Sequence, residues 1–253
     1  MSKTIFSTGA SSGFGEAIAW QFAAGGWDLI ITARRVDRLA ALKVAIEQQH
    51  QVRVLPLGFD VQDRAAVKEN LEQLPADWQN IDVLVNNAGL ALGRDDFDKA
   101  NIDDWETMID TNIKGLLYVS RGVLPYFEAR GKGHIINLGS TAAKDVYAKG
   151  NVYCATKSAV EAISKAQRID LLPKKIKVTA IHPGAAETEF SLVRLKGDQA
   201  ESSKVYEGYK ALEAKDIADI TYYVANLPDH VCINDLVVTC TAQANGYTTY
   251  KES

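Results

Sequence analysis

The chain has 253 residues, of which 47% are hydrophobic and 24% charged, and its net charge is −4 at pH 7. These values are typical of a globular protein, and the acidic balance argues against nucleic acid or an anionic membrane as the main partner, since both require a basic surface. No apolar run reaches the roughly 20 residues that a transmembrane helix needs. Three cysteines without CxxC or metal-like spacing, and an N-terminus without a basic and apolar leader, predict a cytoplasmic protein that binds no metal.

Short apolar runs alternate with longer amphipathic segments along the whole chain. The runs that predict strands are 3–7, 28–32, 52–57, 82–86, 133–138, 176–181 and 235–239. The segments that predict helices are 13–25, 36–50, 62–74, 102–129, 151–172 and 214–226. Apolar strands without polar alternation are buried on both faces, and strand–helix alternation indicates βαβ units. The sequence therefore predicts one α/β domain over 1–253, with a Rossmann-like, doubly wound, seven-stranded parallel sheet and helices on both faces. Residues 185–213 are expected to be an insertion that serves as a substrate-binding lid.

The stretch TGASSGFG at 8–15 places three glycines between the first predicted strand and the first predicted helix. Backbone N–H groups and a helix N-terminus in this arrangement bind phosphate. The spacing differs from GxGxxG, and Glu16 stands where a Walker loop would need a lysine. We expect the loop to contact the pyrophosphate of a dinucleotide, although a mere tight turn is the alternative. The residues assigned to this contact are Gly9, Ser11, Ser12, Gly13, Phe14 and Gly15.

Arg34 and Arg35 follow the second predicted strand, where NAD-preferring folds place an acidic residue for the ribose 2′-OH. A carboxylate there would repel a 2′-phosphate, whereas a guanidinium pairs with it bidentately. The alternative is a pair of solvated arginines, but a helix N-terminus does not favour cations. The pair therefore predicts NADP rather than NAD as the cofactor.

Two further groups lie at the carboxyl ends of predicted strands, where open α/β sheets bind ligands. Asp60 and Val61 follow the third strand, and Asn87, Ala88 and Gly89 follow the fourth. We assign all five to the cofactor, with Asp60 accepting from the adenine amino group and the Val61 N–H beside it. Asp60 fits the N-cap of the next helix equally well, so both roles stay open.

Ser140 ends a predicted strand, and Tyr153 and Lys157 follow it four residues apart, so that they share one face of a helix. A nearby ammonium favours the phenolate and lowers the pKa of a tyrosine. Such a phenol can give a proton to a developing alkoxide or take one from an alcohol. Ser140 is placed to hydrogen-bond the same oxygen. A lone Tyr-x-x-x-Lys is more often a surface pair, and only its occurrence beside the other motifs favours an active site.

In this order, TGASSGFG, NNAG, Asn112 in DTNIKG, Ser140, Tyr153-x-x-x-Lys157 and HPG at 182–184 occur along nearly the whole chain. Together they resemble the short-chain dehydrogenase/reductase family. The resemblance implies that Tyr153 is the general acid/base, that Lys157 binds the nicotinamide ribose and lowers the Tyr153 pKa, and that Ser140 orients the carbonyl. It implies that Asn112 holds a water that links Lys157 to solvent.

The same resemblance extends to the segment after the sixth predicted strand. It implies that Pro183 and Gly184 flank the nicotinamide and that Thr188 contacts its carboxamide or the phosphates. The implied reaction is reversible hydride transfer between NADPH and a carbonyl carbon. It also implies a homotetramer built through the helices predicted at 102–129 and 151–172.

Five stretches, NAGLALG, DWETMIDTN, GNVYCATK, ETEFSLVR and HVCIND, resemble one branch of this family. That branch contains NADP-dependent 3-hydroxy acid dehydrogenases, which act on serine, allo-threonine and 3-hydroxypropionate-like compounds, and also sulfoacetaldehyde reductases. Both substrate types carry a small anion near the reacting carbon. We expect Arg194 to bind that anion bidentately, together with Ser140 and Tyr153 as substrate contacts. The alternative is an Arg194 that is solvated on a mobile lid.

Some residues depart from the branch. Lys144 and Lys149 are extra cations that would either favour a doubly charged or sulfonated substrate or be solvated. His182 stands where an acidic residue is common, and we interpret it as a packing residue rather than a second base. The C-terminal Tyr247 and Tyr250 fit either a contact with a neighbouring subunit or closure over the substrate.

Two other functions stay open. A reductase of larger neutral ketones or acyl thioesters would need a wide apolar lid, whereas FSLVRLKGDQAESSKVYEGYK at 190–210 is mostly polar. An NADP-binding sensor without catalysis would not need to keep Ser140, Tyr153 and Lys157 together. The predicted partner is therefore a small anionic substrate.

Overall fold

The computed structural model describes residues 2–251 and contains a seven-stranded parallel sheet of order β3-β2-β1-β4-β5-β6-β9. Its strands are β1 (Thr4–Thr8), β2 (Asp28–Ala33), β3 (Val54–Gly58), β4 (Val83–Asn86), β5 (Gly133–Leu138), β6 (Ile176–Pro183) and β9 (Asp235–Val238). All seven predicted strands are present, and the predicted fold class is confirmed. The strand order reverses between β1 and β4. Open sheets of this kind bind ligands in a crevice at the carboxyl ends of these two strands, and this region is called the crevice below.

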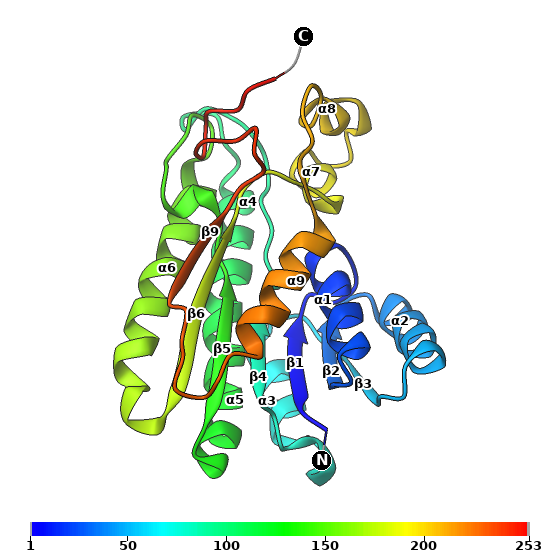
Figure 1. Ribbon diagram of the computed structural model, residues 1–253. Coiled ribbons are helices and arrows are strands. Elements are labelled where there is room, and N and C mark those ends of the chain that lie inside the picture. The colour runs from blue at the N-terminus through cyan, green and yellow to red at the C-terminus, as the bar shows by residue number, and fades with distance from the viewer. Residues whose placement is uncertain (1, 252–253) are drawn as a thin grey trace.

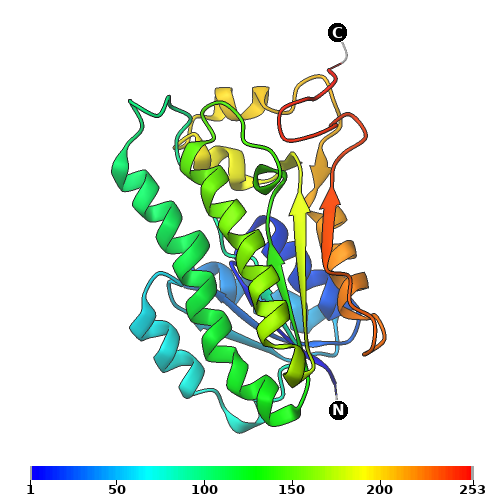
Figure 2. The ribbon, with the colours of Figure 1, turned by 90° about the vertical axis from the view of Figure 1, so that its left-hand side faces the viewer.

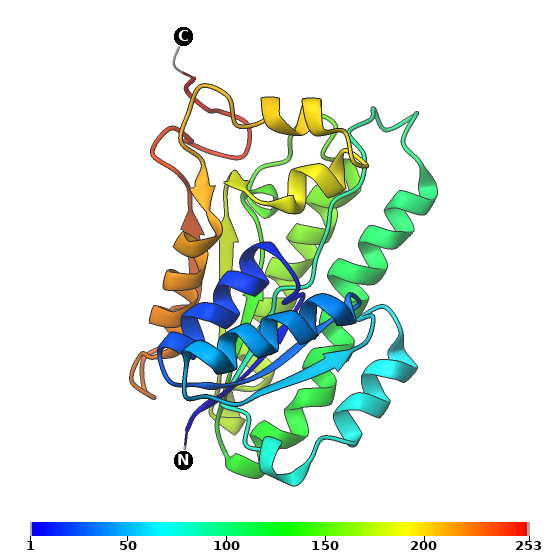
Figure 3. The ribbon, with the colours of Figure 1, turned by 90° about the vertical axis from the view of Figure 1, so that its right-hand side faces the viewer.

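Helices cover both faces of the sheet (Figure 1). One layer contains α1 (Gly13–Ala24), α2 (Val36–Gln49) and α9 (Ala214–Ala225), seen in front in Figure 3. The other contains α3 (Arg64–Glu72), α4 (Ile102–Ile109), α5 (Leu116–Arg130) and α6 (Asn151–Asp170), of which α5 and α6 are in front in Figure 2. Separate apolar clusters fill the two layers, one around Phe22 and Ile31 and the other around Phe6 and Phe127. The sheet is therefore buried on both faces, as its uninterrupted apolar strands predict.

The helix predicted at 102–129 is present, but it is not α-helical throughout. A π-helical segment, Asp110–Gly115, separates α4 from α5. Such π-helical turns are rare, and they are found mostly at functional sites. Asn112 lies on this segment and is only 2% exposed. The wider turn thus directs the buried side chain of Asn112 toward the loop after β4, at the carboxyl ends of the strands.

The cap of α3 decides one alternative that the sequence left open. The Asp63 carboxylate accepts hydrogen bonds from the N–H groups of Ala65 (2.9 Å) and Ala66 (3.0 Å). Asp60 lies three residues before this cap, and its carboxylate accepts a hydrogen bond from Gln62 N instead. The N-cap role considered for Asp60 is therefore wrong, because the helix begins at Arg64 rather than at residue 62.

The segment predicted as an insertion leaves the sheet after β6 and returns at α9. It contains β7 (Ala186–Glu187), α7 (Glu189–Arg194), α8 (Gln199–Lys204) and β8 (Leu212–Glu213). β7 and β8 pair in parallel and close the base of this excursion. α7 and α8 lie beyond the carboxyl ends of the strands (Figures 1 and 3). Whether the excursion moves as a lid stays a prediction.

The C-terminal segment packs against the same end of its own chain. Gln243 Oε1 accepts from Ala185 N at 2.8 Å, and Gly246 N donates to Asp145 at 3.1 Å. The rings of Tyr247 and Tyr250 are 65% and 72% exposed, so neither lies buried over the crevice. Across residues 2–251, no helix combines the length and the apolar character needed to span a membrane.

The cap assignment predicts a stability difference. We expect Asp63→Ala to lower the free energy of unfolding by about 1 kcal/mol, because two N–H groups at the start of α3 lose their acceptor. Urea denaturation measures this change. Asp60→Ala is the matched control and should stay within about 0.5 kcal/mol of the wild type. Equal losses in the two variants would contradict the assignment of Asp63 as the cap.

Candidate active site

The glycine loop after β1 is held in a conformation that only glycine adopts easily. Gly9 has a φ of 69°, in the left-handed region. A Cβ added at Gly15 would collide with the carbonyl oxygen of Gly9, so the loop folds tightly back on the start of α1. Ser12 is the extended N-cap residue of α1, and its side chain makes no capping hydrogen bond. The N-terminus of α1 is therefore presented at the crevice, as phosphate binding requires.

Asn87 fixes this loop against the end of β4. Its Nδ2 donates to Thr8 O at 2.8 Å and to Gly9 O at 3.2 Å. In return, Thr8 Oγ1 accepts from Asn87 N (3.0 Å) and Ala88 N (2.9 Å). The Asn87 side chain, assigned from sequence to the cofactor, thus positions the loop that faces it.

Arg35 lies across the same loop. Its Nε donates to Ser11 Oγ at 3.1 Å and its Nη2 to Ser12 Oγ at 2.7 Å. The other arginine of the pair, Arg34, lies 3.6 Å from Asp60. The alternative of two freely solvated arginines is therefore wrong for Arg35, which is anchored beside the glycine loop.

The residues in the crevice fit a dinucleotide with a 2′-phosphate. Arg34 and Arg35 supply cations at one end, next to the glycine loop. Toward the other end, a Cβ at Gly89 would lie 3.2 Å from Asn112 Oδ1 and 3.5 Å from Lys157 Nζ, so the missing side chain leaves room beside both polar groups. Thr188 lies across the glycine loop, 3.5 Å from the position of a Cβ at Gly13.

Other residues assigned to the cofactor line or support the same crevice. Val61 is buried and packs against Gly115 of the π-helical segment. Pro183 ends β6, and Gly184 N donates to Val238 O at 2.7 Å. Phe14, by contrast, packs against the apolar cluster on the α1 face.

Ser140, Tyr153 and Lys157 are brought together by β5 and α6. Tyr153 and Lys157 are each only 7% exposed. The Ser140 hydroxyl, two residues after β5, accepts from Ala142 N at 3.1 Å, and its interaction with Tyr153 lowers the pKa of that phenol. Lys157 Nζ donates to the Leu138 carbonyl oxygen at 2.9 Å. The three chemical groups predicted from sequence therefore share one enclosed site.

The pKa of Tyr153 is shifted upward, whereas the sequence predicted a downward shift. Burial raises the pKa of Tyr153, Tyr147 adds to this, and the hydrogen bond from Ser140 and the charge of Arg194 oppose it. Burial also lowers the pKa of Lys157 to about 8. The net shift of the Tyr153 pKa is therefore upward, because burial disfavours the phenolate. A lowering of this pKa by Lys157 stays a prediction.

Asn112 is fully engaged through its side chain. Its Oδ1 accepts from Leu90 N at 2.9 Å, and its Nδ2 donates to Leu90 O at 2.8 Å and to Thr156 Oγ1 at 3.0 Å. These bonds join the loop after β4 to α6 one residue before Lys157. The relay water assigned to Asn112 stays a prediction, whereas this bridge is what the side chain does here.

Arg194 lies over the ring of Tyr153, the candidate catalytic residue. Its guanidinium carbon lies 5.4 Å from the Tyr153 ring centroid and 5.6 Å from that of Tyr147. Arg194 Nη1 donates to the Tyr147 hydroxyl at 3.0 Å. Phe190, from the same helix, lies 5.7 Å from the Tyr153 ring centroid. The alternative of a solvated Arg194 is wrong, because α7 packs it onto the two tyrosines.

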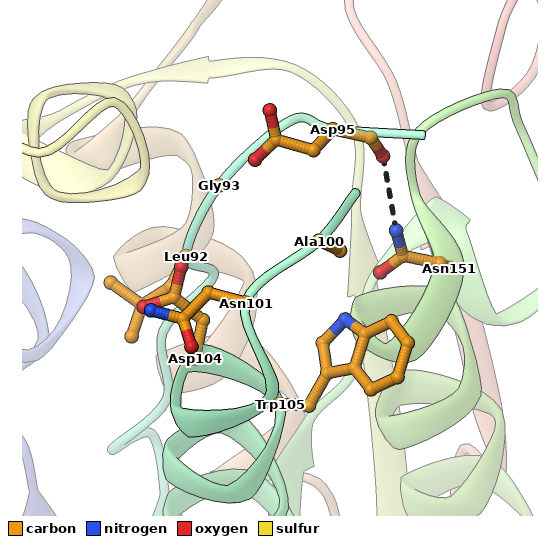
Figure 4. A pocket seen from close by; sticks show the side chains of 8 residues that line it. All are labelled: Leu92, Gly93, Asp95, Ala100, Asn101, Asp104, Trp105 and Asn151. Carbon is orange, nitrogen blue, oxygen red and sulfur yellow. Dashed lines mark hydrogen bonds between the residues drawn. The ribbon is translucent and has the colours of Figure 1, made fainter. Parts of the chain in front are cut away.

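A small pocket beside this site is formed by the loop between β4 and α4 (Figure 4). In it, Asn151 Nδ2 donates to Asp95 O at 3.2 Å and ties the loop to the first residue of α6. None of the predicted catalytic residues lines the pocket. The hydrogen bond between Asn151 and Asp95 thus holds this loop against the start of the helix that carries Tyr153.

His182 connects the site to a charged network behind it. It is fully buried, with Nδ1 3.2 Å from Ser140 O and Nε2 3.1 Å from Asp235 Oδ1. Asp235 also accepts from Lys144 Nζ at 2.7 Å, and Lys144 pairs with Glu161 at 3.0 Å. Lys144 is thus not freely solvated, because two carboxylates bind it, although 26% of its side chain is exposed. Its effect on a charged substrate stays a prediction.

Three residues contact the candidate site although no sequence pattern indicates them: Tyr147, Arg38 and Glu189. Tyr147 lies six residues before Tyr153, and Arg38 lies one turn after the arginine pair. Only the fold brings them to the site, since their partners are distant in sequence. Lys149, which was singled out, is exposed and lies 3.9 Å from Asp96.

Comparisons with known proteins agree with this geometry. The family model described as short chain dehydrogenase matches residues 3–197. The NADP-dependent 3-hydroxy acid dehydrogenase YdfG of Salmonella typhi is 51% identical over 91% of this chain and 92% of its own length. Sulfoacetaldehyde reductase 2 of Chromohalobacter salexigens is 45% identical over 96% of both chains.

A solved structure, the closed form of serine dehydrogenase complexed with NADP+, superposes with a TM-score of 0.91. It is 45% identical and covers 99% of this chain and 100% of its own. The glycine loop, the arginines beside it and the enclosed Ser140, Tyr153 and Lys157 are thus found in a chain that is similar over its whole length to NADP-dependent enzymes. The chain belongs to the short-chain dehydrogenase/reductase family and is an NADP-dependent oxidoreductase.

Proposed function

We propose that the enzyme interconverts a small anionic aldehyde or ketone and its alcohol, such as a 3-hydroxy acid or a sulfonated analogue. The single observation that supports this most is the position of Arg194 over the Tyr153 ring. It puts a fixed cation within reach of a substrate whose oxygen lies at Tyr153. The relatives named for 3-hydroxy acid and sulfoacetaldehyde chemistry support the same class.

The chain's own part in the reaction is to orient the carbonyl and move a proton. When bound, NADP(H) supplies or accepts the hydride. Ser140 and Tyr153 hydrogen-bond the substrate oxygen, and the Tyr153 hydroxyl gives its proton to the alkoxide during reduction or receives one during oxidation. Burial of the phenol keeps it protonated, which suits a general acid. Lys157, with a pKa lowered to about 8, is able to exchange a proton near neutral pH.

Arg194 has the donors that an anion needs. Its Nη1 is shared with Tyr147, and its Nε lies 3.4 Å from Gly93 O, so the guanidinium plane is held at two points. A carboxylate or sulfonate accepts two parallel N–H bonds from such a plane. Tyr147 adds a hydroxyl beside it. A larger neutral substrate would gain nothing from this cation, which disfavours the alternative of a general ketone or acyl thioester reductase.

Two features of the protein outside the site stay proposals. We propose a homotetramer built through α4, α5 and α6, and a cytoplasmic location. Ile169 on α6 is 73% exposed and is available for such an interface.

The anion proposal predicts the effect of Arg194→Ala. Removal of the guanidinium should lower kcat/KM for sulfoacetaldehyde and malonate semialdehyde by at least about 30-fold, because the substrate anion loses its partner. Reduction of propionaldehyde should change by less than about threefold. NADPH oxidation by the purified protein measures all three rates.

Lys196→Ala is the matched control, since it removes another cation of the same segment that pairs with Asp104 instead. Its rates should equal those of the wild type. The anion proposal would be wrong if the wild type reduced the anionic aldehydes and propionaldehyde at equal rates and if Arg194→Ala left these rates unchanged.

The acid role of Tyr153 predicts that Tyr153→Phe lowers kcat by at least about 100-fold, because no other group replaces the phenol proton. Fluorescence titration should give an NADPH dissociation constant within about threefold of the wild type. Tyr223→Phe, on the exposed side of α9, controls for loss of a hydroxyl. A Tyr153→Phe enzyme with near-normal kcat would assign the acid role to another residue.

The burial of Lys157 predicts a pH-dependent gain in stability for Lys157→Met. Because the folded-state pKa is about 8 rather than 10.5, the ammonium destabilises the fold below pH 8, and this cost disappears as the pH rises toward 10.5. We expect the variant to be inactive but more stable at pH 7, by at most about 3 kcal/mol. The difference should shrink by pH 9.5, as urea denaturation at both pH values would show.

Lys99→Met removes an exposed charge and should show no such pH dependence. A Lys157→Met variant that is less stable than the wild type at both pH values would mean that the bond to Leu138 O outweighs the cost of burying the ammonium.

A further inference from the structure

Glu189 binds two arginines at the start of α2. Its Oε1 accepts from Arg38 Nη1 at 2.8 Å, and its Oε2 lies 3.1 Å from Arg35 Nη1. Glu189 is the first residue of α7 and comes from the segment that covers the crevice, about 150 residues later in the chain. The hydrogen bond to Arg38 lowers the pKa of Glu189, so the carboxylate is charged at neutral pH.

This carboxylate lies next to the anchored end of the glycine loop. The Nη1 of Arg35 that binds Glu189 belongs to the guanidinium that also binds Ser11 and Ser12. Carboxylates and phosphates accept from a guanidinium in the same bidentate geometry. The position that Glu189 occupies on Arg35 is thus a position that a phosphate group beside the loop would take.

The charges around the arginines are nearly matched before any cofactor binds. Arg34 pairs with Asp60 at 3.6 Å, and Arg35 and Arg38 share Glu189. A 2′-phosphate brings a charge of about −1.5 to −2 near neutral pH. A phosphate and a carboxylate on the same guanidinium repel each other, so they compete for it.

We propose that Glu189 is an internal counter-anion of the 2′-phosphate site, and that NADP(H) binds by displacing its carboxylate from Arg35. Glu189 then determines how strongly the enzyme favours NADP over NAD, because a cofactor without the 2′-phosphate leaves the pair intact. The displacement also releases the first residue of α7, the helix that carries Phe190 and Arg194 over Tyr153.

The test isolates the 2′-phosphate from the rest of the cofactor. Isothermal titration calorimetry compares 2′,5′-ADP with 5′-ADP in the wild type and in Glu189→Gln. We expect the variant to bind 2′,5′-ADP about 5- to 20-fold more tightly, because the competing charge is gone. Binding of 5′-ADP should change by less than about twofold, and the gain for 2′,5′-ADP should shrink in high salt.

Glu187→Gln is the matched control. Glu187 is an exposed carboxylate on β7, two residues earlier, and it has no arginine partner in residues 2–251. Its substitution by glutamine changes the net charge by the same amount as Glu189→Gln. It should leave both affinities unchanged. An equal gain in Glu187→Gln would mean that only net charge matters and would overturn the proposal.

Weaker binding of 2′,5′-ADP by Glu189→Gln would show that Glu189 holds the arginines ready for phosphate, and unchanged binding would show that it does not reach the site. Either result overturns the proposal. A crystal structure of the wild type with 2′,5′-ADP needs no variant. It should show Glu189 beyond hydrogen-bond distance of Arg35, and an intact pair beside bound phosphate would overturn the proposal. Neither measurement depends on the substrate proposed above.

Discussion

The reciprocal hydrogen bonds between Thr8 and Asn87 are the constraint on which the rest of the site depends. They join the ends of β1 and β4, the two strands between which the sheet order reverses. Because Asn87 also binds Gly9 O, the same contact fixes the glycine loop and thereby the N-terminus of α1. A loop of glycines has high conformational entropy, and this bond set restricts it before a phosphate arrives. The pyrophosphate site is therefore preorganised by side chains that need not touch the cofactor themselves.

Enclosure sets the electrostatics of the catalytic end. Phe190 and Arg194 lie over Tyr153, and burial raises the pKa of this tyrosine. Burial also lowers the pKa of Lys157. Both shifts favour the neutral forms of the two groups. A neutral phenol is a ready proton donor for reduction, whereas oxidation of an alcohol needs a group that accepts a proton. The enclosed, protonated phenol therefore supports the acid role that we propose for Tyr153.

The sequence predicted what depends on local pattern and missed what depends on tertiary contact. All seven strands follow from apolar runs, and the shared helix face of Tyr153 and Lys157 follows from their spacing. The π-helical turn around Asn112 has no such local pattern, because the bonds of Asn112 to Leu90 and Thr156 help to hold it. The upward shift of the Tyr153 pKa was not predicted, because the sequence shows the neighbouring lysine and does not show burial.

One short helix connects the two charged ends of the crevice. α7 has six residues and is therefore about 9 Å long. Glu189, in its first turn, contacts the arginines beside the glycine loop, and Arg194, in its last turn, contacts Tyr147 near the substrate position. An acidic N-terminus and a basic C-terminus also suit the helix dipole. Because so short a helix moves as one unit, any shift of the α7 backbone at Glu189 would also shift Arg194.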